Sequence, residues 1–523
     1  MTLLKNRYLQ IGAAGLLGAL VLLLPRPEGT IFEISGDPAR GLATLVEEDF
    51  ISAERAGPRD SYSLEAEDTI SKPGTALAAA AAELGTGIEV HYVNGLSPKA
   101  FRFLAVLAAL IFLFVVEPIP LEITAILIGV CLVLFDIVPV AAAWATYMHP
   151  VVVFIMCCLI LAIALEKAEL TQRLSHAIAK RAGTSVIRFT FILSIGLGIG
   201  SGVLHDAAAA AIGIATMIPL MRAAGIEPHT NTARFMVLSL AFACSCGGMG
   251  TLVGGGRNMV SAAFLYELTG IEITFLDWIK FAFPIALVTV PAAVLVVYFV
   301  YRPDPSFQLP TYDEEPGPWT DTQKRTVMVL LAVFTAWLTK GLHGIDYSIT
   351  GMLGVAALVS IGVLRWRDIH DRLEWGTALF IFGGGICLGL AMASSGAASY
   401  FAHLFFPLVD GNGWLVLLGG VCVFGALVTN AMANVAAAAL ILPIVIPLAQ
   451  LEGVDPRVLA LGLACATSFA MLLVIGCPPN AIAYSYRQFS SFDLTRAGLV
   501  ATPILLLLLV ATAGIWWSML GLL

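Results

Sequence analysis

SGVLHDAAAAAIGIATMIPL, at residues 201–220, is an apolar run that an acidic residue, Asp206, interrupts. TNAMANVAAAALILPI, at residues 429–444, is a second such run, in which the interrupting residue is Asn434. Asn434 follows Asp206 by 228 residues. A polar helix break that recurs once in each half of a membrane chain is the way in which secondary transporters form a substrate site.

A Gly- or Pro-rich segment follows each run and ends in asparagine. GTLVGGGRN (250–258) ends in Asn258, and VIGCPPN (474–480) ends in Asn480, 222 residues later. Because the two offsets are nearly equal, the chain is predicted to contain two repeats that each carry one helix break.

The composition indicates a membrane protein. Of the 523 residues, 59% are hydrophobic and 12% are charged. In a soluble domain about a quarter of the residues are charged. Many apolar runs reach the roughly 20 residues that cross a bilayer as a helix. The net charge of −8 argues against nucleic acid as a partner.

The nine cysteines all lie in apolar segments, where free thiols pack as small hydrophobic groups. This pattern predicts neither disulfides nor a cysteine metal site. The nine are Cys131, Cys157, Cys158, Cys244, Cys246, Cys387, Cys422, Cys465 and Cys477.

The N-terminal part is predicted to hold one helix and one outside segment. Residues 1–27 form a first transmembrane helix that starts in the cytoplasm, because Lys5 and Arg7 precede the apolar run. Arg26 and Pro27 follow it instead of a small-residue cleavage pattern, so we interpret it as uncleaved. Residues 28–98 form an acidic insertion outside the membrane, either a loop or a compact domain, with a strand-like stretch, GIEVHYV, at 87–93.

The remaining chain divides into membrane repeat 1 (99–301), a Pro-rich acidic linker (302–323) and membrane repeat 2 (324–523). Basic residues follow Glu166, whereas none occurs in the matching segment after Ala393, which predicts opposite orientations of the repeats. The small-residue run at 382–398 and its partner at 154–170 are predicted to be re-entrant hairpins, with ordinary packed helices as the alternative.

Several stretches make the chain resemble the divalent anion/sodium symporter (DASS) family, which carries dicarboxylates, citrate and sulfate. SFAMLLVIGCPPNAIAY (468–484) matches the family signature almost position for position. Further matches are LLLPRPEG (22–29), GLSPKAFR (95–102), VVEPIPLEITAIL (115–127) and DLTRAGL (493–499). The resemblance covers nearly the whole chain outside residues 30–94.

The resemblance implies an all-α polytopic membrane protein with two inverted repeats, re-entrant hairpins and broken helices. It also implies a homodimer in the inner membrane, in which a transport domain moves as an elevator against a scaffold. Family members bind substrate carboxylates and Na⁺ at a Ser-Asn-Thr motif and a Thr-Pro-Pro segment in each repeat. Carried over, the motifs fall on 205–207 and 433–435, and the segments fall on 255–257 and 477–479.

Among the paired Ser-Asn-Thr positions only Asn434 keeps its identity. The resemblance then implies two sets of site residues. The predicted substrate contacts are His205, Asp206, Arg257, Asn434, Cys477 and Pro478. The predicted Na⁺ ligands are Asp206, Gly254, Gly255, Thr429, Asn434 and Asn480.

Two of these residues have open alternatives. Arg257 either grips a carboxylate or sulfonate bidentately or is a snorkelling surface residue. Asp206 either binds sodium, carries a proton with His205 beside it, or forms a structural salt link, for example to an arginine. Adjacent residues on a helix face different ways, so His205 and Asp206 are not expected to share one ligand.

The predicted function is secondary active transport of a small anion (a di- or tricarboxylate, sulfate or a sulfonate), coupled to Na⁺, with no other cofactor. The alternatives are a proton-coupled carrier or anion exchanger that uses Asp206, and a membrane receptor that does not transport. The sequence holds no HExxH or GxSxG motif, so no enzymatic activity is predicted.

Overall fold

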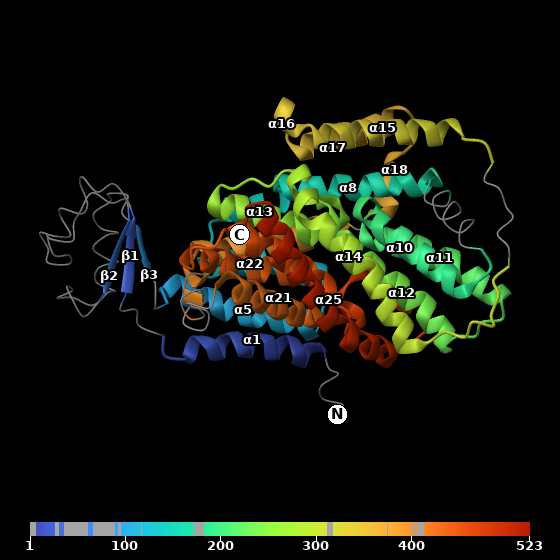
Figure 1. Cartoon of the computed structure of the whole chain (residues 1–523). Coiled ribbons are helices and arrows are strands. Elements are labelled where there is room, and N and C mark those ends of the chain that lie inside the picture. Colours follow the sequence, from blue (N-terminus) through green and yellow to red (C-terminus); the bar gives the residue numbers. More distant parts are fainter. Residues whose placement is uncertain are drawn as a thin grey trace, which may run out of the picture. The chain divides into compact units, whose positions relative to one another are not determined.

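The computed structural model describes residues 7–26, 31–35, 61–65, 89–92, 96–116, 118–170, 173, 183–310, 317–373, 375–398, 400–401, 404 and 413–523. Apart from three short strands, the elements in these ranges are helices (Figure 1). Eight of the described helices are long and apolar enough to cross a membrane. The prediction of an all-α polytopic membrane protein is therefore confirmed.

The three strands lie in the N-terminal insertion. β1 (Ile31–Ser35), β2 (Ser61–Glu65) and β3 (Glu89–Tyr92) form an antiparallel sheet in the order β2-β1-β3, with Cα partners such as Ile31 and Glu65. β3 lies inside the stretch that the sequence predicted to be strand-like. Most of the insertion lies outside the described residues, so the choice between loop and compact domain stays a prediction.

The chain groups into two compact units. The first comprises residues 1–144, 387–411 and 443–452, and the second comprises residues 145–386, 412–442 and 453–523. Helices α1 (Arg7–Leu23), α5 (Pro98–Val116) and α6 (Leu121–Leu134) belong to the first unit, α7 (Val140–Ala145) ends at the boundary, and α19 (Phe382–Ser394) and α22 (Asn434–Leu451) contribute to both.

The second unit holds the remaining helices. Those before the linker are η2 (Thr146–Met148), α8 (Pro150–Lys167), α10 (Val186–Leu204), α11 (Asp206–Ala223), α12 (Asn231–Gly247), η3 (Gly248–Gly250), η4 (Leu252–Gly254), α13 (Gly256–Thr269) and α14 (Phe275–Tyr301). Those after it are α15 (Asp321–Leu338), α16 (Lys340–His343), α17 (Tyr347–Ser360), α18 (Trp366–Arg372), the π-helix η5 (Gly376–Ile381), α21 (Gly413–Ala431), α23 (Pro456–Ala466), η6 (Thr467–Phe469), η7 (Val474–Gly476), α24 (Pro478–Ser485) and α25 (Ser491–Met519).

The order of the elements repeats. The series α10, α11, α12, η3, η4, α13, α14 returns as α21, α22, α23, η6, η7, α24, α25. The repeat extends to single hydrogen bonds: Asn258 Nδ2 donates to the Gly248 carbonyl at 2.8 Å, and Asn480 Nδ2 donates to the Ala470 carbonyl at 2.7 Å. Each asparagine thus fixes the loop ten residues before it, which supports the two repeats that the sequence spacing predicted.

Both segments predicted as re-entrant hairpins begin as helices. α8 covers most of residues 154–170, and η5 leads directly into α19 over residues 382–394. Residues 171–172 and 174–182 after the first segment, and most of 402–412 after the second, lie outside the described residues, so the hairpins stay a prediction. Seven of the nine cysteines are buried, and Cys131 and Cys158 are half-buried, which agrees with their predicted packing role.

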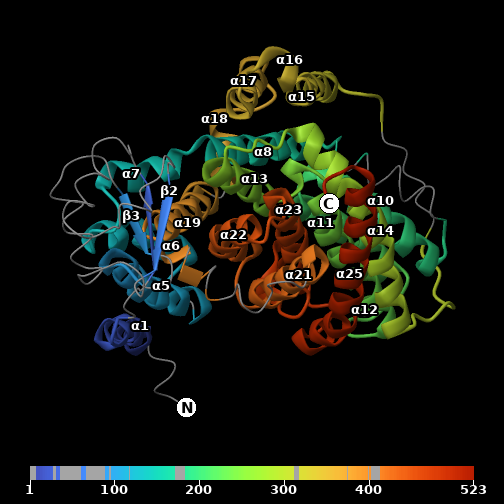
Figure 2. The ribbon, with the colours of Figure 1, turned by 60° about the vertical axis from the view of Figure 1, so that its left-hand side comes forward.

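Helix α12 is the centre of the second unit. It packs against α10 and α14, and α14 in turn lies beside α25 (Figure 2). At its C-terminal end Gly247 touches α10 so closely that an added Cβ would lie 1.6 Å from the Gly198 carbonyl oxygen. Because no side chain fits there, the glycine lets α10 cross α12 just before the first helix break.

Candidate functional site

The first helix break lies between α10 and α11. α10 ends at Leu204, α11 begins at Asp206, and His205 between them has φ +70° and ψ 142°. This backbone region is sparsely populated by residues other than glycine and costs of order 1–3 kcal/mol. Such strain is concentrated at functional sites, because the surrounding structure must enforce it.

The second break lies between α21 and α22. α21 ends at Ala431 and α22 begins at Asn434, so Asn434 has the same position at the start of its helix as Asp206. The structure therefore places both residues from which the sequence predicted a site at helix starts.

A cavity of about 960 Å³ lies between the two breaks, within the second unit. The residues predicted to contact substrate all line it: His205, Asp206, Arg257, Asn434, Cys477 and Pro478. Of the predicted Na⁺ ligands, Asp206 and Asn434 line the cavity. Gly254, Gly255, Thr429 and Asn480 are not among its lining residues. Thus the predicted substrate contacts come together, although they derive from four separate segments.

Four helices begin at this cavity: α11, α13, α22 and α24. For α11, α13 and α24 no side chain caps the N-terminus. Backbone N–H groups in the first turn of a helix have no partner within the helix, and the helix dipole adds partial positive charge there. α24 contributes mainly its dipole, because its first two residues, Pro478 and Pro479, have no N–H. Helix starts that converge on one cavity therefore favour an anion inside it.

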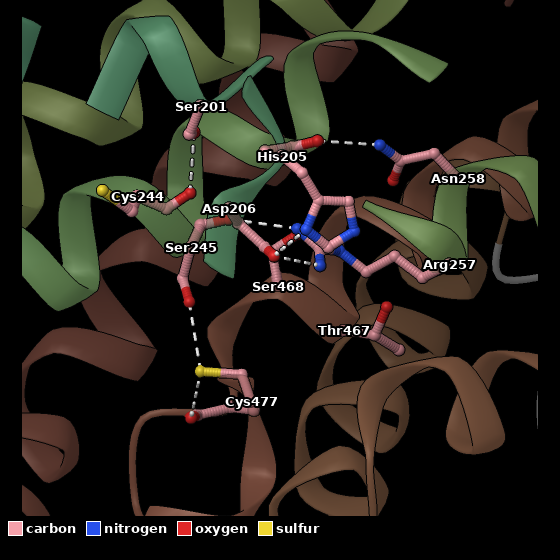
Figure 3. A network of polar contacts seen from close by, with 12 residues as sticks. Ser201, His205, Asp206, Cys244, Ser245, Arg257, Asn258, Thr467, Ser468 and Cys477 are labelled. Carbon is pink, nitrogen blue, oxygen red and sulfur yellow. Dashed lines mark hydrogen bonds and ion pairs between the residues drawn. The ribbon is translucent and has the colours of Figure 1, made fainter. Parts of the chain in front are cut away.

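A buried ion pair joins Asp206 and Arg257. Arg257 Nη1 donates to Asp206 Oδ2 at 2.9 Å, and the Arg257 and Asp206 side chains are 1% and 2% exposed, respectively. Arg257 Nε donates to Ser468 Oγ at 2.8 Å, and Nη2 donates to the Ser245 carbonyl at 3.1 Å (Figure 3). Arg257 is therefore not a snorkelling surface residue, and Asp206 has the arginine salt link that was one of its alternatives.

His205 adds a second contact to the same carboxylate. Its Nδ1 lies 3.2 Å from Asp206 Oδ1. The sequence argument assumed that both residues belong to one helix and face different ways. His205 instead lies outside the helix, and its positive φ turns the ring toward Asp206.

Asn434 presents an unused donor in the other half. Its side chain lines the cavity and is 4% exposed, and within the described part of the chain its Nδ2 has no hydrogen-bond partner. A buried donor without a partner costs about 1–3 kcal/mol. A ligand that carries an oxygen acceptor, such as a carboxylate, would remove this cost.

The other predicted Na⁺ ligands lie near the breaks as well. Thr429 is buried and donates to the Thr467 carbonyl at 3.4 Å. Asn480 is buried, and in the described chain its Oδ1 accepts no hydrogen bond. Gly254 packs against Gly248 so closely that a Cβ added to Gly254 would lie 2.3 Å from the Gly248 carbonyl oxygen.

Two further charged pairs join α8 to α18. Glu166 and Arg372 line the cavity, are 65% and 46% exposed, and approach to 3.7 Å. Beside them Lys167 Nζ lies 2.5 Å from Asp368 Oδ2. The hydrogen bond from Lys167 is the largest cause that lowers the pKa of Asp368 below its usual value.

Sequence reasoning assigned no role to Ser245 and Ser468, which hold the guanidinium. A serine inside an apolar segment carries no distinctive signal. The repeat spacing gave a weak signal for Ser468. It lies 222 residues after Cys246, which is the same offset that relates Asn480 to Asn258.

Two repeats with broken helices, and helix starts that meet at a buried cavity, define a secondary membrane transporter and not an enzyme. The model of the sodium:sulfate symporter transmembrane region matches residues 88–523. The chain belongs to this family, which confirms the resemblance to the DASS transporters.

Relatives of this chain are transporters too. An uncharacterized transporter of Haemophilus influenzae is 26% identical over 80% of this chain and 92% of its own length. The sodium-dependent dicarboxylate transporter SdcS of Staphylococcus saprophyticus is 25% identical over 77% of this chain and 84% of its own. Among solved structures, the YdaH transporter of Alcanivorax borkumensis is 14% identical, with a TM-score of 0.48 and coverage of 72% of this chain and 87% of that one.

Proposed function

We propose that this protein is a secondary active transporter that carries a small anion together with Na⁺. The observation that carries the proposal is the convergence of four helix N-termini on one cavity, beside Asn434 Nδ2, which has no hydrogen-bond partner in the described chain. The sodium-dependent dicarboxylate transporters among the relatives support both the anion and the coupling ion.

The charges around the cavity explain why a cation would accompany the anion. Arg257 is paired with Asp206, and Arg372 is paired with Glu166. No arginine or lysine without a carboxylate partner is therefore present among the described residues that line the cavity. Helix N-termini supply only partial charges, so a bound Na⁺ would add the full charge that a carboxylate or sulfate needs.

The ligands for this Na⁺ are proposed on the second half. Thr429 and Asn434 stand before and at the second break, and Asn480 has a buried amide oxygen without a partner in the described chain. Hydroxyl, amide and carbonyl oxygens suit a hard cation. Of the first-half candidates, Asp206 and Gly255 lie against the Arg257 guanidinium instead, and Gly254 packs against Gly248.

The geometry argues against the proton-coupled alternative. A proton carrier must exchange its proton during the cycle, but Asp206 is held by a guanidinium, which does not lose its proton in proteins. We further propose that the protein works as a homodimer in the inner membrane, by an elevator movement, as the family resemblance implies.

Uptake into proteoliposomes tests the function. The purified chain is reconstituted, and uptake of labelled succinate and sulfate is compared under an inward Na⁺ gradient, an equal K⁺ gradient and a pH series. We expect uptake of at least one anion that depends on Na⁺. Uptake that follows the proton gradient without Na⁺ would favour the alternative, and uptake of neither anion under any gradient would contradict the proposal.

A further inference from the structure

We propose that the guanidinium of Arg257 is a built-in cation that replaces an exchangeable Na⁺ in the first repeat. Coupling then uses one Na⁺ per chain, bound in the second repeat. This inference rests on the proposed function and concerns how many ions that function consumes.

The repeat register places the guanidinium where the two halves differ. Asn258 and Asn480 make the same loop hydrogen bond, so the residues before them, Arg257 and Pro479, are equivalent. Asp206 is equivalent to Asn434 at the helix break. The first half thus has a carboxylate and a cation where the second half has a neutral amide and a proline.

The partners of the guanidinium are the oxygen types that bind Na⁺. They are a carboxylate oxygen of Asp206, the carbonyl oxygen of Ser245 and the hydroxyl oxygen of Ser468, at 2.8–3.1 Å from the nitrogens. These oxygens come from both repeats and enclose one buried positive charge. Because the guanidinium is permanently charged, binding of Na⁺ to the same oxygens is unfavourable. Like charges a few ångströms apart repel strongly in a buried site.

The local backbone makes room for this group. A Cβ on Gly255 would lie 2.7 Å from Arg257 Nη1 and 3.0 Å from Cζ. The equivalent position in the second half is Cys477, whose thiol contacts Ser245 Oγ at 3.1 Å. The GGRN sequence (255–258) therefore both supplies the cation and leaves the space that it fills, whereas the equivalent CPPN sequence (477–480) does neither.

Direct counting of bound sodium tests the inference. Equilibrium binding of ²²Na⁺ to the purified full-length chain is measured, with choline as the replacement cation. We expect one saturable Na⁺ per chain in the unaltered protein, with a Hill coefficient of about one for the Na⁺ dependence of thermal stability. Two Na⁺ per chain would overturn the inference and leave the proposed function intact, whereas no saturable binding would overturn both.

Two variants test the role of the charge. Arg257→Ala exposes the Asp206 carboxylate to an exchangeable cation, so we expect the number of bound Na⁺ to rise from one to two. Arg257→Lys keeps a fixed positive charge and serves as the matched control, with one Na⁺ expected. If Arg257→Ala does not fold in choline, its thermal stability is measured with and without Na⁺. We expect Na⁺ to restore the folded state of Arg257→Ala, whereas Arg257→Lys should be folded without Na⁺. An unchanged Na⁺ count and no Na⁺ dependence of the stability of Arg257→Ala would contradict the inference.

Discussion

Arg257 Nη1 lies 2.9 Å from Asp206 Oδ2, and this pair is buried inside a membrane chain at the point where one helix breaks. The two residues are 51 positions apart, so the pair also fixes the start of α13 against the start of α11. Its first consequence concerns stability.

Removing one partner of this pair should be costly. In choline buffer Asp206→Ala and Arg257→Ala should each lower the free energy of unfolding by about 3–5 kcal/mol, because an unpaired buried charge remains. The double variant should lose less than the sum of the two. Denaturation of the detergent-purified protein measures this, and Arg372→Ala is the control, since its half-exposed pair should contribute about 0–1 kcal/mol. Additive losses would show that the pair is not coupled.

Asn434 should matter for transport and little for stability. Its Nδ2 has no partner to lose in the described chain, but a hydrogen bond to a charged ligand contributes about 1.5–3 kcal/mol. Asn434→Ala should therefore weaken anion binding by roughly 10- to 100-fold with an almost unchanged melting temperature.

Asn430 is the matched control for that experiment. It lies one turn earlier, and its amide accepts from the Leu472 N–H at 2.7 Å and donates to the Ala426 carbonyl at 2.6 Å. Asn430→Ala should lower stability because it leaves the Leu472 N–H without its acceptor. Equal anion affinity in Asn434→Ala and the unaltered protein would remove Asn434 from the site.

Gly247 should tolerate no side chain. A Cβ there would lie 1.6 Å from the Gly198 carbonyl oxygen, and backbone on both sides cannot give way cheaply. Gly247→Ala should reduce the yield of folded protein severely, by more than the 1–3 kcal/mol or so of ordinary overpacking. Gly420→Ala in α21 is the control, because a Cβ there meets nothing within 4 Å. A folded, active Gly247→Ala protein would contradict the close helix crossing.

The Lys167–Asp368 pair predicts a pH dependence. The pKa of Asp368 is lowered in the folded protein, so its stabilising contribution is present above the unfolded pKa of about 3.9 and is lost as pH falls through the lower folded value. Asp368→Asn should therefore lower the melting temperature slightly at pH 7 and have less effect near pH 3. Asp136→Asn, at a carboxylate whose side chain is 93% exposed, is the control. If Asp368→Asn lowered the melting temperature by the same amount at pH 7 and near pH 3, the stabilising role of the ionised Asp368 would be contradicted.

The helix breaks could be predicted from sequence because polar residues are rare in apolar runs and recur at a fixed offset. Asp206 and Asn434 are the two polar residues that gave this signal, and both lie at helix starts on one cavity. The paired glycine- and proline-rich segments were equally visible, since glycine and proline mark non-helical backbone.

The partner of Asp206 was not fixed by the sequence. Arg257 was assigned to the substrate, and an arginine salt link to Asp206 stood as an alternative, because spacing alone does not show which two charges meet. Ser245 and Ser468 were missed since small hydroxyl residues are common in packed membrane helices. The orientation of His205 depended on a positive φ, which the residue type does not indicate.

The bonds that hold Arg257 also restrict how the protein can move. The guanidinium of the first repeat is bound to Ser468 of the second, and Cys477 of the second repeat contacts Ser245 of the first. A clamshell motion that parted the two cavity walls would break both of these buried links at once. We therefore expect the two cavity walls to move together during release, as the elevator movement proposed above requires.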